Sequence, residues 1–261
     1  MAAIPAEAGP ADTPSAPLLA WAAAAPDRAI ACRLIAPQGA VQDLAAHAAT
    51  TALPAAGLRH LPLAMAWARE RGTGPVPRIP AVRADSLPRY PGIHASTALP
   101  GDVMLDDATL AGLALISDDL PAAGALHDRL GRPAVNRVLL ACGCSTRAHF
   151  PAPADTAGAP RLTAGDAAAL MAALMSDPVY TVLRSRVLSN APAPPGRGGA
   201  PRDGLCLGRP PFTTPGPMAF AGCLRLPEGV LVCGALDGRA DSSRAAWDTL
   251  CDALEATVSE L

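Results

Sequence analysis

The clearest hydrophobic pattern lies at the C-terminal end of the chain, where two apolar runs precede a periodic segment. Residues 218–226 and 230–236 are rich in apolar side chains, and Pro227-Glu228-Gly229 between them is typical of a tight turn. From Trp247 onward, apolar residues recur at helical spacing, with charged residues on the other side. The pattern predicts a β-hairpin followed by an amphipathic helix that packs on a sheet.

The apolar side of this last helix predicts how the helix docks. It consists of Trp247, Leu250, Cys251, Leu254, Val258 and Leu261. Docking is expected through Trp247, Leu250, Leu254 and Val258, and Asp241 is expected to cap the helix. If Leu254 is fully buried, its truncation to Ala costs about 2–5 kcal/mol of stability.

Further periodic and apolar runs predict the rest of the fold. Strands are expected at 29–36, before a turn at Pro37-Gln38-Gly39, and at 134–142. Helices are expected at 16–26, 41–51, 61–71 and 120–132, and after a capping box at Thr163 to Asp166. The combination indicates an α+β fold, a single domain with helices packed on a central β-sheet.

Proline and glycine divide the chain into an extension, a domain and two long loops. Residues 1–14 are small, acidic and proline-bearing, and are expected to be disordered, which leaves 15–261 as one domain. The stretches 72–101 and 191–217 are Pro-rich and are expected to be long surface loops, with 191–210 among the most mobile residues.

Composition narrows the class of protein further. Half of the residues are hydrophobic but only 3% are aromatic, so the core depends on closely packed small and aliphatic side chains. All 21 basic residues are arginine, which a GC-rich coding bias explains better than a need for bidentate donors. The net charge of -2 predicts no general affinity for nucleic acid or for an anionic membrane.

Cysteine usage and the N-terminal residues indicate a compartment. Seven scattered cysteines, an odd number in a chain of this size, favour reduced thiols over a disulfide framework. No basic residue precedes Arg28, so a signal peptide is not expected, and no apolar run is long enough for a membrane span. The sequence predicts a soluble cytoplasmic protein, and a homo-oligomer is compatible with it.

The segment Cys142 to His149 holds the candidate catalytic residues. Placed at the end of the expected strand 134–142, Cys142, Cys144 and His149 supply thiols and an imidazole, and Arg147 supplies a substrate-binding guanidinium. The alternative is structural, because buried cysteines followed by a Ser-Thr turn need no function. The same two thiols and imidazole resemble a zinc ligand set, but the spacing is unusual and a fourth ligand is distant, so no metal is predicted and no cofactor can be named.

Other polar residues are weaker candidates for a functional role. Arg197 and Arg202, in a glycine-rich segment, can close over a substrate as a lid, or belong to a plain surface loop. His47 and His127 fall in expected helices and are interpreted as structural, whereas His94 falls in a loop. The acidic pairs Asp106-Asp107 and Asp118-Asp119 precede helical patterns, so helix capping is favoured over paired catalytic carboxylates.

Two function classes follow from these residues. The sequence slightly favours an enzyme that acts on a small or peptidyl substrate at a Cys-containing strand end, with 191–217 as its lid. The alternative is a non-catalytic ligand-sensing or accessory module that binds a protein partner. A small-molecule or peptide ligand fits either class, and whether the protein is an enzyme stays open at this point.

Overall fold

A five-stranded antiparallel sheet lies at the centre of the structure and joins the two ends of the chain. The computed structural model describes residues 15–71, 81–90, 94–146, 148–153, 159–186, 188, 204–209 and 216–261. The strand order is β2-β1-β9-β8-β7, and β1 pairs with β9 along its whole length. The strands are β1 (Arg28–Ile35), β2 (Val41–His47), β7 (Gly204–Arg209), β8 (Met218–Leu226) and β9 (Gly229–Asp237).

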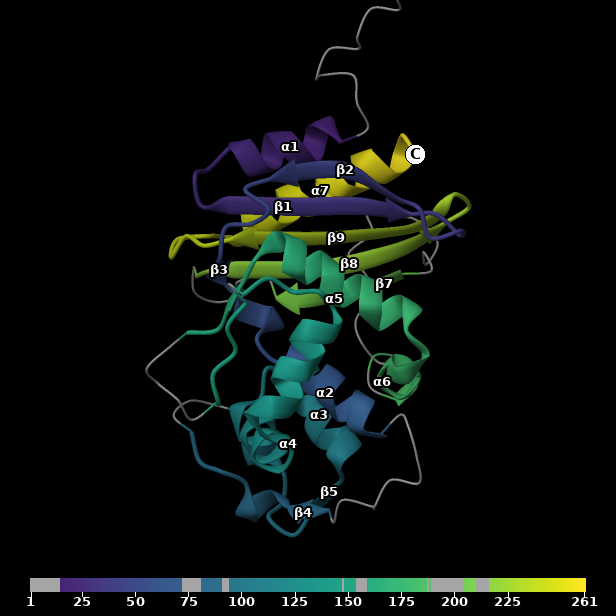
Figure 1. Cartoon of the computed structure of the whole chain (residues 1–261). Helices are drawn as coiled ribbons and strands as arrows, with labels where there is room; N and C mark the ends of the chain where they lie inside the picture. The colour runs from purple at the N-terminus through teal and green to yellow at the C-terminus, as the bar shows by residue number, and fades with distance from the viewer. Residues whose placement is uncertain are drawn as a thin grey trace, which may run out of the picture.

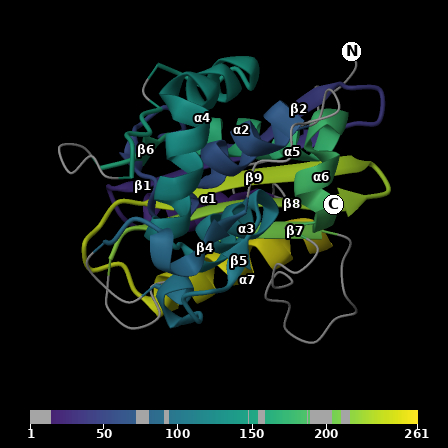
Figure 2. The same ribbon diagram turned by 90° about the horizontal axis from the view of Figure 1, so that it is seen from below.

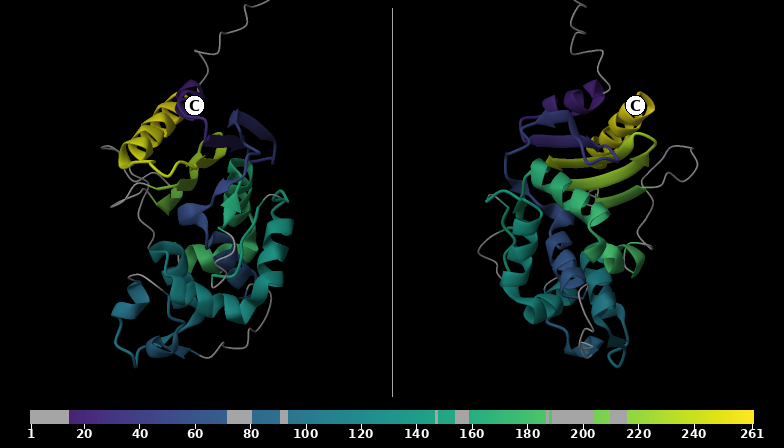
Figure 3. Two further views of the ribbon diagram at one scale, coloured as in Figure 1. Left: turned by 90° about the vertical axis from the view of Figure 1, so that its left-hand side faces the viewer. Right: turned by 45° about the vertical axis from the view of Figure 1, so that its right-hand side comes forward.

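Helices cover both faces of this sheet (Figure 1). Helices α1 and α7 lie on one face, α5 lies on the other, and the remaining helices form a layer beyond α5 (Figures 2 and 3). The α-helices are α1 (Ala16–Ala23), α2 (Leu61–Arg71), α3 (Asp107–Ser117), α4 (Leu120–Ala141), α5 (Ala164–Ser176), α6 (Thr181–Arg186) and α7 (Arg244–Ser259). The predicted α+β class, with helices packed on a central sheet, is confirmed.

Short elements connect these layers. Two small antiparallel ladders pair β3 (Leu53–Pro54) with β6 (Arg161–Leu162) and β4 (Val82–Arg83) with β5 (Met104–Leu105). Single 3-10 turns are η1 (Ala56–Leu58), η2 (Ala84–Ser86), η3 (Ala95–Ala98) and η4 (Pro178–Tyr180). Turn η1 leads directly into the start of α2 and packs against β7 and β8.

The two faces of the sheet carry side chains of different size. Toward α5 the central strands present mostly small residues, and toward α1 and α7 they present larger ones. The α5 face includes Ala29, Ala31, Ala219, Ala221 and Gly234, and the opposite face includes Ile30, Met218, Phe220 and Leu231. Because side chains alternate along a strand, this division follows from the sequence order within each strand.

Helix α2 is buried on every side. Its residues from Leu61 to Ala68 are all buried, and Trp67 is among the largest fully buried side chains. A helix that is apolar all round lies inside a domain rather than on its surface. The predicted bounds of this helix, 61–71, are confirmed.

The predicted C-terminal hairpin and helix are confirmed. Strands β8 and β9 pair antiparallel around their turn, and α7 docks through Trp247 and Leu250, both buried. Leu254 and Val258 are only partly buried, so Leu254→Ala is expected to cost less than full burial would imply. The predicted cap at Asp241 is wrong, because Ser243 occupies the N-cap position.

The predicted strand at 134–142 is wrong, because these residues form the second half of α4. Gly131, with φ of 73°, interrupts the helix, and Pro133 begins the next turn. Pro is compatible with the first turn of a helix. The buried positions 134, 135, 138 and 139 have helical spacing, while Leu140 is 80% exposed. A short apolar run is ambiguous between strand and helix, and here the period decides.

The predicted helix at 41–51 is also wrong, because Val41–His47 is the edge strand β2. It pairs antiparallel with β1 after the predicted turn at Pro37-Gln38-Gly39, where Gly39 has φ of 87°. Alanine in this segment favours a helix locally, but pairing with an adjacent strand outweighs that preference.

The remaining segments of the predicted domain plan fall partly outside the described residues. Residues 1–14 and most of 191–217 lie there, although β7 shows that the second Pro-rich stretch contains a strand. The first Pro-rich stretch contains β4 and two 3-10 turns. In the part of the chain that the structure describes, no helix is long and apolar enough to span a bilayer.

An ion pair ties the first strand to the last. Arg28 Nε lies 3.0 Å from Asp237 Oδ2, both side chains are buried, and the Arg28 guanidinium also donates to the carbonyl of Trp21. Arg239 contacts the same carboxylate at 2.7 Å. Burial alone would raise the pKa of Asp237, but the hydrogen bonds from Arg239 and Arg28 outweigh it and lower that pKa.

We predict that Gly234→Ala destabilises the protein, because α5 lies directly on this position. A Cβ there would collide with the Ala164 carbonyl oxygen and would lie 2.8 Å from Ala167 Cβ. Overpacking of this kind costs about 1–3 kcal/mol. Urea denaturation of the variant measures the loss. The control is Gly216→Ala, where a Cβ meets nothing within 4 Å; equal stability of both variants would contradict the proposed contact.

Candidate functional site

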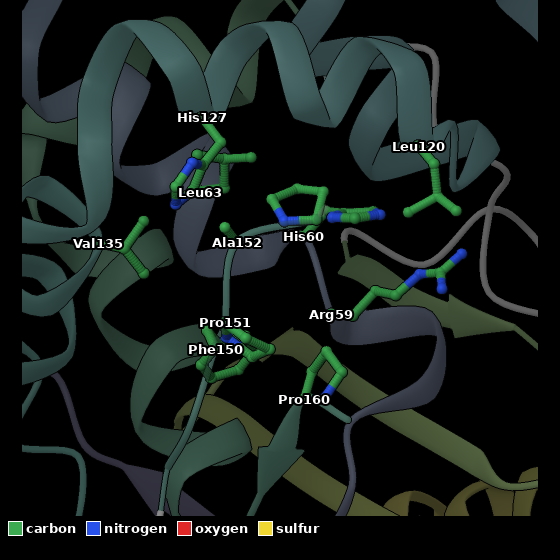
Figure 4. Close-up of a pocket in the computed structure, with 11 residues that line it drawn as sticks. Arg59, His60, Leu63, Leu120, His127, Val135, Phe150, Pro151, Ala152 and Pro160 are labelled. Carbon is green, nitrogen blue, oxygen red and sulfur yellow. The ribbon is translucent and has the colours of Figure 1, made fainter. Parts of the chain in front are cut away.

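A cavity lies between the start of α2, the helix α4 and the segment before β6. Its volume is about 170 Å³. Figure 4 shows His127 and Leu120 extending from α4 on one side, with Phe150, Pro151 and Pro160 on the opposite side. The lining residues are Arg59, His60, Leu63, Leu120, His127, Val135, Phe150, Pro151, Ala152, Pro153 and Pro160. The cavity is thus mostly apolar, with three basic side chains on its wall.

Arg59 is held in place by Asp118. Its Nε and one terminal nitrogen each lie 2.6 Å from a different oxygen of the Asp118 carboxylate, a bidentate pair that restricts the guanidinium to one orientation. Asp118 ends α3 in the left-handed region, with φ of 55° and ψ of 37°. This conformation, which short polar residues tolerate better than others, directs the chain from α3 into α4.

His60 is a neutral, buried imidazole. The residue is only 5% exposed, and burial, together with the nearby Arg59 charge, lowers its pKa to about 3. Nε2 of His60 lies 3.4 Å from Asp118 Oδ1, but the ring N–H does not point along that line, so this nitrogen has no hydrogen-bond partner among the described residues. A buried polar atom of this kind is available to a ligand.

His127 places a second imidazole on the cavity wall. Burial lowers its pKa, and the neighbouring charges of Asp128 and Arg132 act in opposite directions. Its Nε2 is also buried and lacks a hydrogen-bond partner within the described part of the chain. His127 lies in α4 as the sequence predicted, but its position on the cavity wall makes it a candidate ligand-binding residue.

The two acidic pairs divide their roles between capping and ion pairing. Asp106 and Asp119 cap α3 and α4 by accepting from backbone amides, which confirms the predicted capping. The other member of each pair binds an arginine: Asp107 lies 2.7 Å from Arg71, and Asp118 binds Arg59. Adjacent residues point apart, so neither pair forms a two-carboxylate site.

Of the sequence-predicted catalytic residues, Cys142 and Cys144 follow the C-terminal end of α4 rather than a strand, and His149 forms an isolated β-bridge with Arg161. Cys142 and Cys144 are half-buried and His149 is exposed. Burial raises the pKa of both thiols, and the Asp166 carboxylate raises that of Cys144 further. A raised pKa disfavours the thiolate that nucleophilic cysteines require. Their catalytic role stays a prediction.

The other predicted site residues are the three substrate-binding arginines. Arg147, Arg197 and Arg202 lie outside the described residues. Within those described, no group of three His, Cys, Asp or Glu side chains is arranged to hold a metal ion, so the zinc alternative for Cys142, Cys144 and His149 has no support.

Solved structures of known enzymes share the fold. No protein-family model and no curated protein matches the chain. A β-lactamase from Xanthomonas campestris superposes with a TM-score of 0.70 at 22% identity, over 95% of this chain and 98% of the other. A β-lactamase from Chitinophaga pinensis gives 0.71 at 13% identity, over 92% and 96%. The chain has the β-lactamase fold.

A third structure with this fold records a covalent intermediate. It is a variant of PBP-A described as an acyl-enzyme complex with penicillin G, and it gives a TM-score of 0.68 at 17% identity, over 95% of both chains. At these identities the similarity establishes the architecture alone, because one fold supports many functions. The chemistry of this chain has to be argued from its own residues.

Arg59 and His60 were missed by the sequence interpretation. They are adjacent polar residues immediately before a helix that is apolar all round, and Pro62 follows them. Two polar residues at the start of a buried helix must lie at the boundary of the core. This position alone could have marked Arg59 and His60 as candidate site residues. Their contact with Asp118, which lies 59 residues from Arg59 in the sequence, could not be predicted from the neighbouring residues.

We predict that His60 makes the protein sensitive to acid. In the unfolded chain its pKa is about 6.5, and in the folded protein about 3, so the unfolded state binds the proton first and stability falls as the pH drops through this window. Between about pH 7 and about pH 5 the loss from this residue is about 2 kcal/mol.

Urea unfolding of His60→Gln at these two pH values tests the acid effect. The variant should lose less stability on acidification than the wild type, because glutamine does not titrate. His149→Gln, which replaces an exposed imidazole, is the control and should behave as the wild type. Identical pH dependence in His60→Gln and wild type would show that His60 is not the acid-sensitive group.

We also predict slow thiol chemistry at Cys142 and Cys144. Because burial raises both pKa values, a disulfide reagent at neutral pH should modify these thiols more slowly in the folded protein than in the urea-unfolded chain. Peptide mass spectrometry identifies each modified residue. Faster modification of either thiol in the folded state would instead support the cysteine enzyme predicted from sequence.

Proposed function

We propose that this protein is a small-molecule-binding module on the β-lactamase fold that does not form an acyl-enzyme. The observation that carries the proposal is the absence of lysine from the sequence, in which all 21 basic residues are arginine. Class A β-lactamases and penicillin-binding proteins use S-x-x-K, S-D-N and K-T-G motifs, with the serine of S-x-x-K as nucleophile. Two of these three motifs require a lysine.

The third motif persists in altered form. Ser117-Asp118-Asp119 differs from S-D-N only at its last residue. Its two carboxylates have structural partners: Asp118 binds Arg59, and Asp119 accepts from Ser96 and caps α4. These contacts support a site whose polar groups maintain the turn between α3 and α4 rather than position a reacting group.

The segment compared with S-x-x-K lacks a nucleophile with an adjacent base. Gly57 and His60 have the spacing of Ser and Lys in S-x-x-K, and we interpret this Gly-x-x-His segment as its counterpart, because His60 and Arg59 are the residues that contact Asp118. Glycine carries no hydroxyl, and arginine cannot accept a proton near neutral pH. The neutral His60 imidazole could act as a base, but no described hydroxyl or thiol donates to its Nε2.

The cavity supports the binding of a small molecule without a chemical reaction. Its apolar wall and unpartnered imidazole nitrogens have the composition of a small-molecule site, where a few polar groups orient a ligand among apolar side chains. This favours the ligand-sensing alternative over the enzyme that the sequence slightly favoured.

Incubation with penicillin G tests the proposal directly. We expect no covalent adduct in the intact-protein mass spectrum, because the residues that activate and receive the acyl group are missing. PBP-A, whose acyl-enzyme complex with penicillin G is known, serves as the positive control. A stoichiometric adduct on any serine or cysteine of this chain would overturn the proposed function.

A further inference from the structure

Two buried imidazole nitrogens in one cavity lack hydrogen-bond partners. Nε2 of His60 and Nε2 of His127 both line the cavity and find no partner among the described residues, and His60 is only 5% exposed. Most buried polar atoms in folded proteins are paired, so an unpaired atom needs an explanation. A ligand that offers a complementary polar atom to each imidazole supplies one (Figure 4).

The charges around the cavity favour a neutral ligand. His60 is uncharged at neutral pH because its pKa is about 3. Arg59, the lining residue with a permanent charge, has two hydrogen bonds to Asp118 at 2.6 Å each. Asp118 offsets the charge of Arg59 and so weakens its attraction for an anion, and a cation would meet the guanidinium without a carboxylate among the lining residues.

Size and wall composition limit the ligand to a single ring. The cavity volume of about 170 Å³ is close to that of an engineered protein cavity of about 150 Å³ that binds benzene. The apolar wall includes Leu63, Val135 and the ring of Phe150, which suit the faces of a flat ring.

We propose that the cavity binds a neutral, flat, six-membered nitrogen heterocycle that carries a carbonyl oxygen next to a ring N–H. This inference rests on the proposed function and names its ligand class. The neutral His60 imidazole, in the tautomer that carries its proton on Nε2, donates to the ligand carbonyl. The ligand N–H donates to the lone pair of His127 Nε2, so each unpartnered nitrogen gains a hydrogen bond.

Binding of 2-pyridone, measured by ligand-observed NMR, tests the ligand class. N-methyl-2-pyridone, which keeps the carbonyl but lacks the N–H, is expected to bind about three- to tenfold more weakly, the effect of one lost hydrogen bond. Toluene, benzoate and benzamidinium represent an apolar, an anionic and a cationic ring, and are expected to bind more weakly still.

Variants of the two histidines test the binding geometry. His60→Phe and His127→Phe should each weaken 2-pyridone binding about three- to tenfold, and His47→Phe, on the edge strand β2, should leave it unchanged. If the buried His60 variant does not fold, the side-chain nitrogen spectrum of the wild type replaces it. There, 2-pyridone should shift the Nε2 signals of both cavity histidines.

Several outcomes would overturn the inference without touching the proposed function. Toluene binding as tightly as 2-pyridone would mean that the imidazoles take no part. Tightest binding of benzoate would mean that the cavity selects an anion through Arg59 in spite of the pairing with Asp118. No binding of any ring at about 10 mM, weaker than the affinity scale of small ligands, would mean that this class is wrong. Only the penicillin adduct bears on the proposed function itself.

Discussion

The close approach of α5 to the central sheet is the constraint on which the other layers depend. At Gly234 a side chain would collide with the backbone of α5, and the strands around it present Ala29, Ala31 and Ala221 to the same helix. Helix α5 contributes Ala164, Ala167 and Ala168 to this contact, and all three are buried. Small residues on both surfaces let the backbones pack closely, which compensates for a chain with few aromatic side chains.

That packing places the helical layer, and with it the cavity. Because α5 lies flat on the sheet, the start of α2 fits between the sheet and α4, where Arg59 reaches Asp118 at the turn between α3 and α4. The bidentate pair joins two segments that are 59 residues apart. Polar groups at this junction therefore stabilise the architecture, and Arg59 also lines the cavity.

The fold of this protein does not by itself determine its chemistry. The architecture follows that of β-lactamases and PBP-A at 13–22% identity, yet the chain has no lysine from which to build two of the three motifs associated with acyl transfer. Arg59 and the neutral His60 contact Asp118 instead. An apolar cavity with unpartnered imidazoles suits recognition of a ligand, and recognition needs neither an activated serine nor a base.

The sequence by itself determined the elements whose signals are local. The C-terminal hairpin, the apolar side of α7, the buried helix α2 and the aspartate caps of α3 and α4 each depend on residues within a few positions of one another. The tertiary structure decided the rest. Residues 41–47 became a strand because β1 lies beside them, and 134–141 became a helix whose positions 134, 135, 138 and 139 pack into the core. Arg59, His60 and His127 form one cavity only because the chain brings distant segments together, and no local pattern encodes such long-range contacts.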